Sequence, residues 1–106
     1  MQEPLVSIVV PCYNYGRFLG SCLEAIFAQQ GGHSFEVIVI DDASTDETQD
    51  VLARYADPRL RAITHPKNQG HIASVSEGFL MSRGRILARI DPDDRYKPWF
   101  LWETLA

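Results

Sequence analysis

The sequence predicts an α/β fold in which a parallel sheet of about four strands is flanked by helices. Two observations carry this prediction. Short β-branched runs alternate with segments of helical periodicity, and only a few residues connect one to the next. The strand-like runs are also apolar at most positions, as expected of strands that are covered on both faces. Right-handed crossovers are the expected connections in such a sheet.

The chain begins with a strand pattern followed by a helix pattern. Residues 5–10 read L-V-S-I-V-V, a β-branched run closed by Pro11, so we expect a buried strand. Between residues 18 and 30 the apolar side chains recur at the spacing of one helix face. Two glycines at 31–32 are expected to end this helix.

Two of the predicted strands end in acidic residues. Residues 35–40 read F-E-V-I-V-I and run directly into Asp41 and Asp42, whose charges cannot continue a buried strand. Residues 85–90 read R-I-L-A-R-I and run into the D-P-D-D sequence of residues 91–94. The carboxyl ends of parallel strands share one edge, where ligands bind in such folds, so we expect these carboxylates on one rim.

A second helix is predicted after the first acidic pair. Ser44 is followed three residues later by Glu47, which is typical of a capping box at the start of a helix. The apolar face of this helix is expected to consist of Val51, Leu52 and Tyr55.

A further strand and helix are predicted before the last strand. Residues 60–64 form a short strand candidate, and the N-Q-G sequence at 68–70 is typical of a turn. Gly84 is expected to end the helix that follows this turn. The apolar residues expected to pack that helix are Ile72, Val75, Phe79 and Leu80.

The last residues predict another helix, which Pro98 opens and which continues to Ala106. It is heavily apolar and has no glycine, proline or basic last turn to finish it, so it needs a packing partner. We therefore interpret residues 1–106 as one N-terminal domain fragment of a longer protein. The alternative is a complete small domain that dimerises through this helix. Self-association through the exposed fourth strand and this helix is a further expectation.

The composition argues against several classes of protein. Apolar residues make up 45% and charged residues 23% of the 106-residue chain, the balance of a soluble globular domain. The net charge of −4 argues against a nucleic-acid partner, whose phosphates attract a basic surface. No apolar run approaches the roughly 20 residues of a membrane span, and no secretory signal opens the chain. A cytoplasmic location is expected, and peripheral membrane attachment of the intact protein stays open.

The cysteines and histidines give no sign of a metal site. Cys12 and Cys22 lack CxxC spacing and are expected to be buried thiols rather than a disulfide or zinc ligands. His33, His65 and His71 have no partner at metal-ligand spacing, so we expect them on the surface.

The acidic rim is suited to a divalent cation. Mg²⁺ or Mn²⁺ prefers oxygen ligands and commonly takes only one or two carboxylates, completing its octahedron with substrate phosphates. The D-x-D spacing of Asp91 and Asp93 fits such a metal–diphosphate complex. Asp94, Asp46 and Glu47 are adequately explained as residues that favour a helix N-terminus.

Three glycine-containing motifs are missing. The turn after the first strand reads P-C-Y-N-Y-G, which contains neither GxGxxG nor GxxxxGK[ST], so dinucleotide-dependent oxidoreduction and P-loop chemistry are disfavoured. GxSxG is absent too, which gives little support to serine hydrolase chemistry. Tyr13 and Tyr15 are candidates for stacking on a base, but aromatic residues beside a strand end are as often packing residues.

Four motifs, in order and spacing, resemble the N-terminal half of family 2 glycosyltransferases. They are V-S-I-V-V-P-C-Y-N at 6–14, E-V-I-V-I-D-D-A-S-T-D-E-T at 36–48, N-Q-G at 68–70 and D-P-D-D at 91–94. The resemblance implies a GT-A fold with a Rossmann-like nucleotide-binding half. It also implies transfer of a sugar from a nucleotide diphosphate donor, with a UDP-sugar expected, to a sugar or glycan acceptor with inversion.

The resemblance assigns roles to the first two motifs. Pro11, Tyr13 and Asn14 resemble the segment that lines the nucleoside pocket. Asp42 is similar to the acid that hydrogen-bonds the base, and Asp41 to its structural neighbour.

The last motif resembles the metal-binding pair. Asp91 is similar to the acid directed toward ribose or metal-bound water, and Asp93 to the ligand of Mn²⁺ or Mg²⁺ that holds the diphosphate. The general base and the acceptor site are expected beyond residue 106, so residues 1–106 alone are expected to bind donor without transferring sugar. Val75 stands where the family usually has arginine.

Two other hypotheses come from different classes. A metal-dependent nucleotidyltransferase also uses an α/β sheet, but it would favour a glycine-rich basic loop after the first strand, which is missing. A non-enzymatic receiver-like module would need a lysine late in the sheet. Lys67 and Lys97 instead follow turns.

Overall fold

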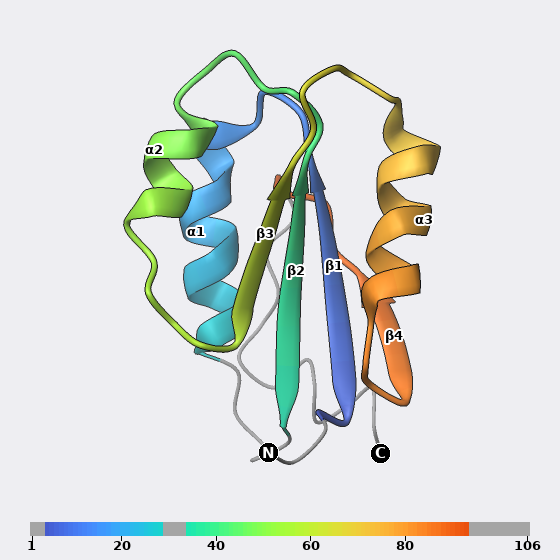
Figure 1. The fold of residues 1–106 in the computed structure, drawn as a ribbon. Coiled ribbons are helices and arrows are strands. Elements are labelled where there is room, and N and C mark those ends of the chain that lie inside the picture. Colours follow the sequence, from blue (N-terminus) through green and yellow to red (C-terminus); the bar gives the residue numbers. More distant parts are fainter. Residues whose placement is uncertain (1–3, 29–33, 94–106) are drawn as a thin grey trace.

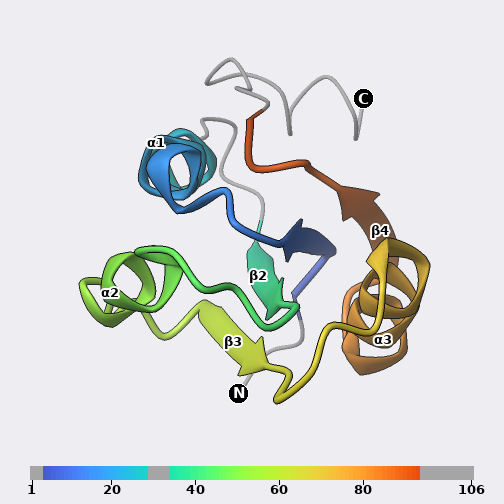
Figure 2. The same ribbon diagram turned by 90° about the horizontal axis from the view of Figure 1, so that it is seen from above.

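The computed structural model describes residues 4–28 and 34–93, and it confirms the α/β prediction. A four-stranded parallel sheet has the order β3-β2-β1-β4. The strands are β1 (Val6–Cys12), β2 (Phe35–Asp41), β3 (Leu60–Thr64) and β4 (Ile86–Arg89). The helices are α1 (Gly16–Phe27), α2 (Thr48–Ala53) and α3 (His71–Met81). Helices α1 and α2 cover one face of the sheet and α3 covers the other (Figure 1, Figure 2).

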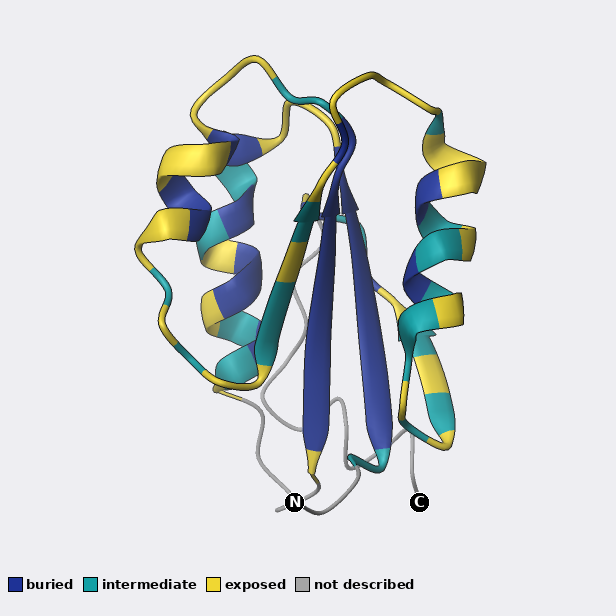
Figure 3. Ribbon diagram, viewed as in Figure 1, coloured by how far each residue is buried: buried dark blue, intermediate teal, exposed yellow. Residues whose placement is uncertain are grey.

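The two central strands form the core. Every residue of β1 and β2 is buried, whereas β4 alternates between half-buried and exposed residues (Figure 3). From α1, Leu19, Leu23 and Ile26 pack against this core, which explains why the helical spacing was readable in the sequence. Cys12 and Cys22 are buried and not joined in a disulfide, as expected.

Strand β1 continues through Pro11, which the sequence pattern had placed at its end. Pro11 pairs with Ile40 in the parallel register, but the pairing of β1 with β4 extends only from Val6 to Val9. Past Val9, β1 therefore has a paired strand only on the β2 side. A missing backbone N–H is tolerated at such an edge position.

The predicted capping box is wrong. Helix α2 begins at Thr48, and neither Ser44 nor Glu47 caps it through its side chain. Asp46 takes this role instead, because its Oδ1 accepts the backbone N–H of Thr48 at 3.0 Å. Its Oδ2 accepts the backbone N–H of Gly16 at 2.9 Å, so one carboxylate serves the first turns of two helices. Burial would raise the pKa of Asp46, but these hydrogen bonds lower it.

Helix α3 faces the sheet with small residues rather than with its largest apolar ones. Its buried residues are Ser74 and Gly78, while Ile72 and Leu80 are 82% and 87% exposed. A Cβ atom on Gly78 would lie 2.4 Å from Val9 Cγ1, so the helix lies too close to β1 for any larger residue there. The expectation that Ile72 and Leu80 pack this helix is therefore wrong.

Some predictions concern residues that the structure does not describe. The glycines at 31–32, His33, Asp94 and the helix expected from Pro98 lie outside the described residues. Among the helices within residues 4–28 and 34–93, none combines the length and the apolar character that a membrane crossing requires.

Candidate functional site

A cleft of about 720 Å³ lies at the carboxyl edge of the sheet. Its walls come from the segments that follow β1, β2 and β4, together with the turn before α3 and the first turn of that helix. The predicted site residues that line it are Pro11, Tyr13, Asn14, Asp42, Asp91 and Asp93. The two acid-terminated strands thus deliver Asp42 and Asp93 to a common cleft. Asp41 is fully buried and does not line it.

Asp42 is a buried, ionised acceptor in the wall of this cleft. Only 3% of the residue is exposed. Its Oδ1 faces His65 Nδ1 at 2.8 Å and accepts the backbone N–H of Gln69 at 2.7 Å. Its Oδ2 accepts the backbone N–H of Gly70 at 2.9 Å. Burial would raise the pKa of Asp42, but the hydrogen bonds from His65, Gln69 and Gly70 hold it below its usual value.

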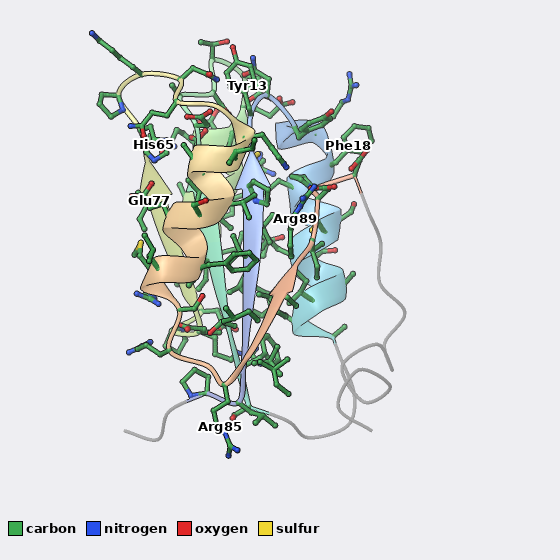
Figure 4. The ribbon with its side chains drawn as sticks, turned by 90° about the vertical axis from the view of Figure 1, so that its right-hand side faces the viewer. Tyr13, Phe18, His65, Glu77, Arg85 and Arg89 are labelled. Carbon is green, nitrogen blue, oxygen red and sulfur yellow. The ribbon has the colours of Figure 1, made fainter. Side chains whose placement is uncertain are left out.

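His65 is buried, so its predicted surface position is wrong. It directly follows β3, and its backbone N–H donates to the carbonyl of Asp41 at 2.8 Å, which carries the ring to the same sheet edge as the aspartates. Its Nε2 contacts Glu77 of α3, and both residues are labelled in Figure 4. The hydrogen bond to Asp42, followed by that to Glu77, raises the pKa of His65. His65 follows a predicted strand directly, and this position would have indicated the carboxyl edge of the sheet. Metal-ligand spacing along the sequence does not contain that information.

Asp41 braces the loop that follows β2. Its Oδ1 accepts the backbone N–H of Ser44 at 3.0 Å, and its Oδ2 accepts a hydrogen bond from Gln49 of α2. The same Gln49 amide donates to Thr64 Oγ1 at 2.8 Å, which ties the loop to β3. Asp41 therefore supports the cleft from within the protein.

The loops after β1 and β2 are joined to each other. The backbone N–H of Asn14 donates to Ser44 Oγ at 2.9 Å, and Asn14 Oδ1 accepts the backbone N–H of Thr45 at 2.8 Å. Asn14 and Ala43 have left-handed φ values of 58° and 65°, a conformation that costs a residue with a side chain free energy. Next to Asn14, Tyr13 is 47% exposed and lines the cleft.

Asp91 and Asp93 supply the acidic part of the cleft. The guanidinium of Arg89 lies 3.2 Å from Asp91 Oδ1, while Asp93 is exposed. Within residues 4–28 and 34–93, no cluster of three or more His, Cys, Asp or Glu side chains is arranged to hold a metal ion. A Mg²⁺ or Mn²⁺ ion that takes most of its ligands from phosphates and water needs only one or two carboxylates, so this pair fits that coordination chemistry.

The sequence reasoning did not assign a site role to several other residues of the cleft. Asn68 and Gly70 of the N-Q-G turn line it, and so do His71 and Ser74 from the start of α3. Gly70 has a φ of 98°, which explains why a glycine follows Gln69 at this turn. Val75, which stands in place of an arginine, is half-buried and does not line the cleft.

The family model described as Glycosyl transferase family 2 matches residues 7–106. The chain belongs to glycosyltransferase family 2. Putative glycosyltransferase EpsH of Bacillus subtilis is 36% identical over 107 residues, which cover 99% of this chain and 30% of EpsH. The succinoglycan biosynthesis protein ExoO of Rhizobium meliloti is 37% identical over 97 residues, covering 92% of this chain and 28% of ExoO. The family 2 chain described here thus spans about a third of the length of these relatives.

Solved structures agree with the fold. The structure of S. aureus TarS 1-349 in complex with UDP-GlcNAc superimposes with a TM-score of 0.80 at 23% identity, over 98% of this chain and 30% of that one. The mannosyltransferase PcManGT from Pyrobaculum calidifontis, in complex with GDP-Man and Mn2+, gives a TM-score of 0.78 at 26% identity. That match covers 91% of this chain and 29% of PcManGT. The α/β architecture of this family 2 chain is therefore that of GT-A glycosyltransferases.

Proposed function

We propose that this chain is the donor-binding part of a glycosyltransferase that uses a nucleotide diphosphate sugar, with a UDP-sugar as the first candidate. The observation that carries the proposal is the single cleft that Asp42 shares with Asp91 and Asp93. The lining of this cleft includes a buried acceptor, Asp42, an exposed aromatic residue, Tyr13, and two further carboxylates. A nucleoside diphosphate has matching parts, namely a flat base with polar edges and a phosphate chain that binds divalent cations.

The nucleoside is proposed to bind between the loops after β1 and β2. Asp42 is ionised, so it accepts hydrogen bonds and donates none. Three donors occupy its oxygens, and a carboxylate has about four acceptor positions, which leaves one for an N–H of the base. Tyr13 offers a ring face on which the base can stack. Pro11 and Asn14 complete this side of the cleft.

The diphosphate is proposed to lie toward Asp91 and Asp93. These two residues would hold Mn²⁺ or Mg²⁺, with Asp93 as the direct ligand. The structure of PcManGT in complex with GDP-Man and Mn2+ supports a divalent cation in this proposal. The ion would supply positive charge that stabilises the departing diphosphate. Arg89 keeps Asp91 oriented at the end of β4 through their ion pair.

The transfer step needs a further group. An inverting displacement requires a base that takes the proton of the acceptor hydroxyl on the far side of the sugar. We place this base and the acceptor site beyond residue 106, in the part of the relatives that this chain does not span. The chain as described is accordingly proposed to bind donor without transferring sugar.

Isothermal titration calorimetry with UDP and Mn²⁺ tests the proposal. We expect the wild-type chain to bind and Asp93→Asn to weaken binding at least about tenfold, because a carboxylate ligand of the cation is lost. Asp50→Asn is the matched control, since Asp50 is exposed on α2 and lies outside the cleft. The proposal fails if the wild type does not bind UDP. The metal role of Asp93 fails if both variants bind like the wild type.

A further inference from the structure

His65 lies between two carboxylates directly behind the wall of the cleft. Its side chain and that of Asp42 are each 5% exposed, and Glu77 on α3 closes the other side. Asp42 and Glu77 are the charged groups that face the ring, the first from the end of β2 and the second from α3. His65 itself does not line the cleft, so it can act on a ligand only through these neighbours.

Asp42 connects His65 to the shape of the cleft. Besides His65, it binds the backbone N–H groups of Gln69 and Gly70. Gly70 directly precedes α3, whose residues His71 and Ser74 also line the cleft. A rotation of the Asp42 carboxylate would therefore release the turn that positions this wall.

The contacts of the ring require two protons on it. Both Nδ1 and Nε2 face carboxylate oxygens, of Asp42 and Glu77 respectively. An imidazole donates from both nitrogens only when it is protonated. In the neutral ring one nitrogen would present a lone pair to a carboxylate oxygen, which is repulsive. The raised pKa of His65, caused first by Asp42 and then by Glu77, agrees with this geometry.

We propose that His65 is a positioning residue of the donor site: its doubly donating ring fixes the Asp42 carboxylate and, through it, the turn at 68–70, so that nucleotide affinity falls when the ring loses its proton. The inference rests on the proposed function, because it concerns the affinity of the same cleft. To the proposed donor site it adds a buried side chain that does not line the cleft, and to the nucleotide affinity it adds a dependence on pH. The affinity for UDP is expected to be highest where Asp42 is ionised and His65 is protonated.

The test compares UDP affinity from pH 6.5 to 9 with Mg²⁺ present, in the wild type, His65→Gln and Glu77→Gln. We expect affinity in the wild type to fall as pH rises through the pKa of His65. In His65→Gln the affinity for UDP should be about tenfold weaker than in the wild type at pH 6.5, and the loss of affinity with rising pH that the wild type shows should be absent. Glu77→Gln removes the more exposed acceptor, so the pH at the midpoint of the loss should drop by about one unit. Comparing variants at equal pH cancels the titration of UDP itself.

Glu24→Gln on α1 is the matched control for Glu77→Gln, because Glu24 is exposed and lies outside the donor cleft. It should keep the wild-type midpoint. The inference is overturned if the wild type shows no pH step, or if Glu77→Gln and Glu24→Gln share one midpoint. A failure of His65→Gln to fold leaves the Glu77→Gln comparison decisive.

Nuclear magnetic resonance separates this inference from the proposed function. Without ligand, the amide resonances of Gln69 and Gly70 should move with the same midpoint as the ring protons of His65. If the wild type does not bind UDP, the proposed function fails, yet this coupling still decides whether His65 controls the turn. If the amide resonances of Gln69 and Gly70 do not change as His65 titrates, the positioning role of His65 is contradicted.

Discussion

Two buried carboxylates stand at opposite ends of β2 and have different kinds of partner. Glu36, near the amino end, and Asp42, just past the carboxyl end, are each 3% exposed. Burial would raise the pKa of both, but their hydrogen bonds lower it. Glu36 accepts hydrogen bonds from the Ser7 hydroxyl at 2.6 Å and from the guanidinium of Arg61 at 2.8 Å. Asp42 accepts hydrogen bonds from a titratable histidine and from two backbone N–H groups, and it lines the cleft.

The same arrangement, a buried carboxylate held by hydrogen bonds, thus occurs at both edges of the sheet. At the amino edge the donors are the Ser7 hydroxyl, the backbone N–H of Arg83 and two guanidinium groups that keep their charge at any working pH, so the network holds segments together. At the carboxyl edge the donors come from a turn and a histidine, which leaves one side of the carboxylate toward the cleft. In parallel sheets the carboxyl edge is where ligands bind, so the binding role is proposed for the equally buried acid at that edge.

The largest effect on stability is expected from Glu36→Gln. The change removes the negative charge between Arg61 and Arg83 and replaces one of the two acceptor oxygens of Glu36 by an amide donor, which should lower the free energy of unfolding by about 2–4 kcal/mol. Urea denaturation measures this, with the exposed Glu24→Gln as control. Nucleotide affinity of the folded fraction should stay unchanged. A loss below about 0.5 kcal/mol would contradict the structural role given to Glu36.

Most of this framework was readable in the sequence. Strands β1 and β2 could be predicted because strands buried on both faces are apolar at most positions. The aspartates that end β2 and follow β4 indicated the edge of the sheet where the cleft lies. The network of Glu36 was not predicted, because its partners Arg61 and Arg83 come from distant segments and only the folded sheet brings them together.

Two errors came from local patterns that tertiary contacts override. Ser44 and Glu47 have capping-box spacing, yet the Ser44 hydroxyl accepts the N–H of Asn14 and Asp46 caps the helix. The apolar residues of α3 did not reveal that the helix approaches β1 so closely that Gly78 must face it. Neither contact leaves a trace in the spacing of residues along the chain.

The second prediction concerns the other end of β2. Asp42→Asn keeps the shape but replaces an ionised acceptor by an amide that must direct its own N–H groups toward donors, so it should cost about 2 kcal/mol of stability. Unlike Glu36→Gln, it should also weaken UDP binding at least about tenfold. Calorimetry on the folded variant measures this. Equal affinities for Asp42→Asn and the wild type would remove the distinction between the two ends.

The pH dependence of stability sharpens the comparison. The pKa of His65 is raised in the folded protein. The contribution of His65 to the free energy of unfolding is therefore fully present below about pH 6.5 and is lost as pH rises through the pKa of the folded state. The pKa of Glu36 is lowered, so its contribution is lost only as pH falls, starting near pH 4.5. As pH rises above about 6.5, the unfolding free energy should therefore fall in the wild type and be flatter in His65→Gln. Parallel curves would contradict the account of the carboxyl edge.

The smallest effect is expected from Ala43→Gly. Among the residues that the structure describes, the non-glycine positions with positive φ are Asn14 and Ala43, both in loops at the carboxyl edge. Glycine relieves the strain at a φ of 65° and should raise the unfolding free energy by about 0.5 kcal/mol, after its greater freedom in the unfolded chain is subtracted. Thermal unfolding measures the shift. A clear destabilisation would show that the alanine methyl group contributes packing that outweighs the strain.

The most direct test maps UDP binding onto the two edges by nuclear magnetic resonance. With Mg²⁺ present, the account predicts that UDP shifts the amide resonances of Tyr13, Gly70 and Asp93 at the carboxyl edge. Those of Glu36 and Arg83 at the amino edge should stay in place. Shifts confined to the amino edge, or no saturable shift at the carboxyl edge, would contradict the claim that the aspartates after β2 and β4 form one nucleotide-binding cleft.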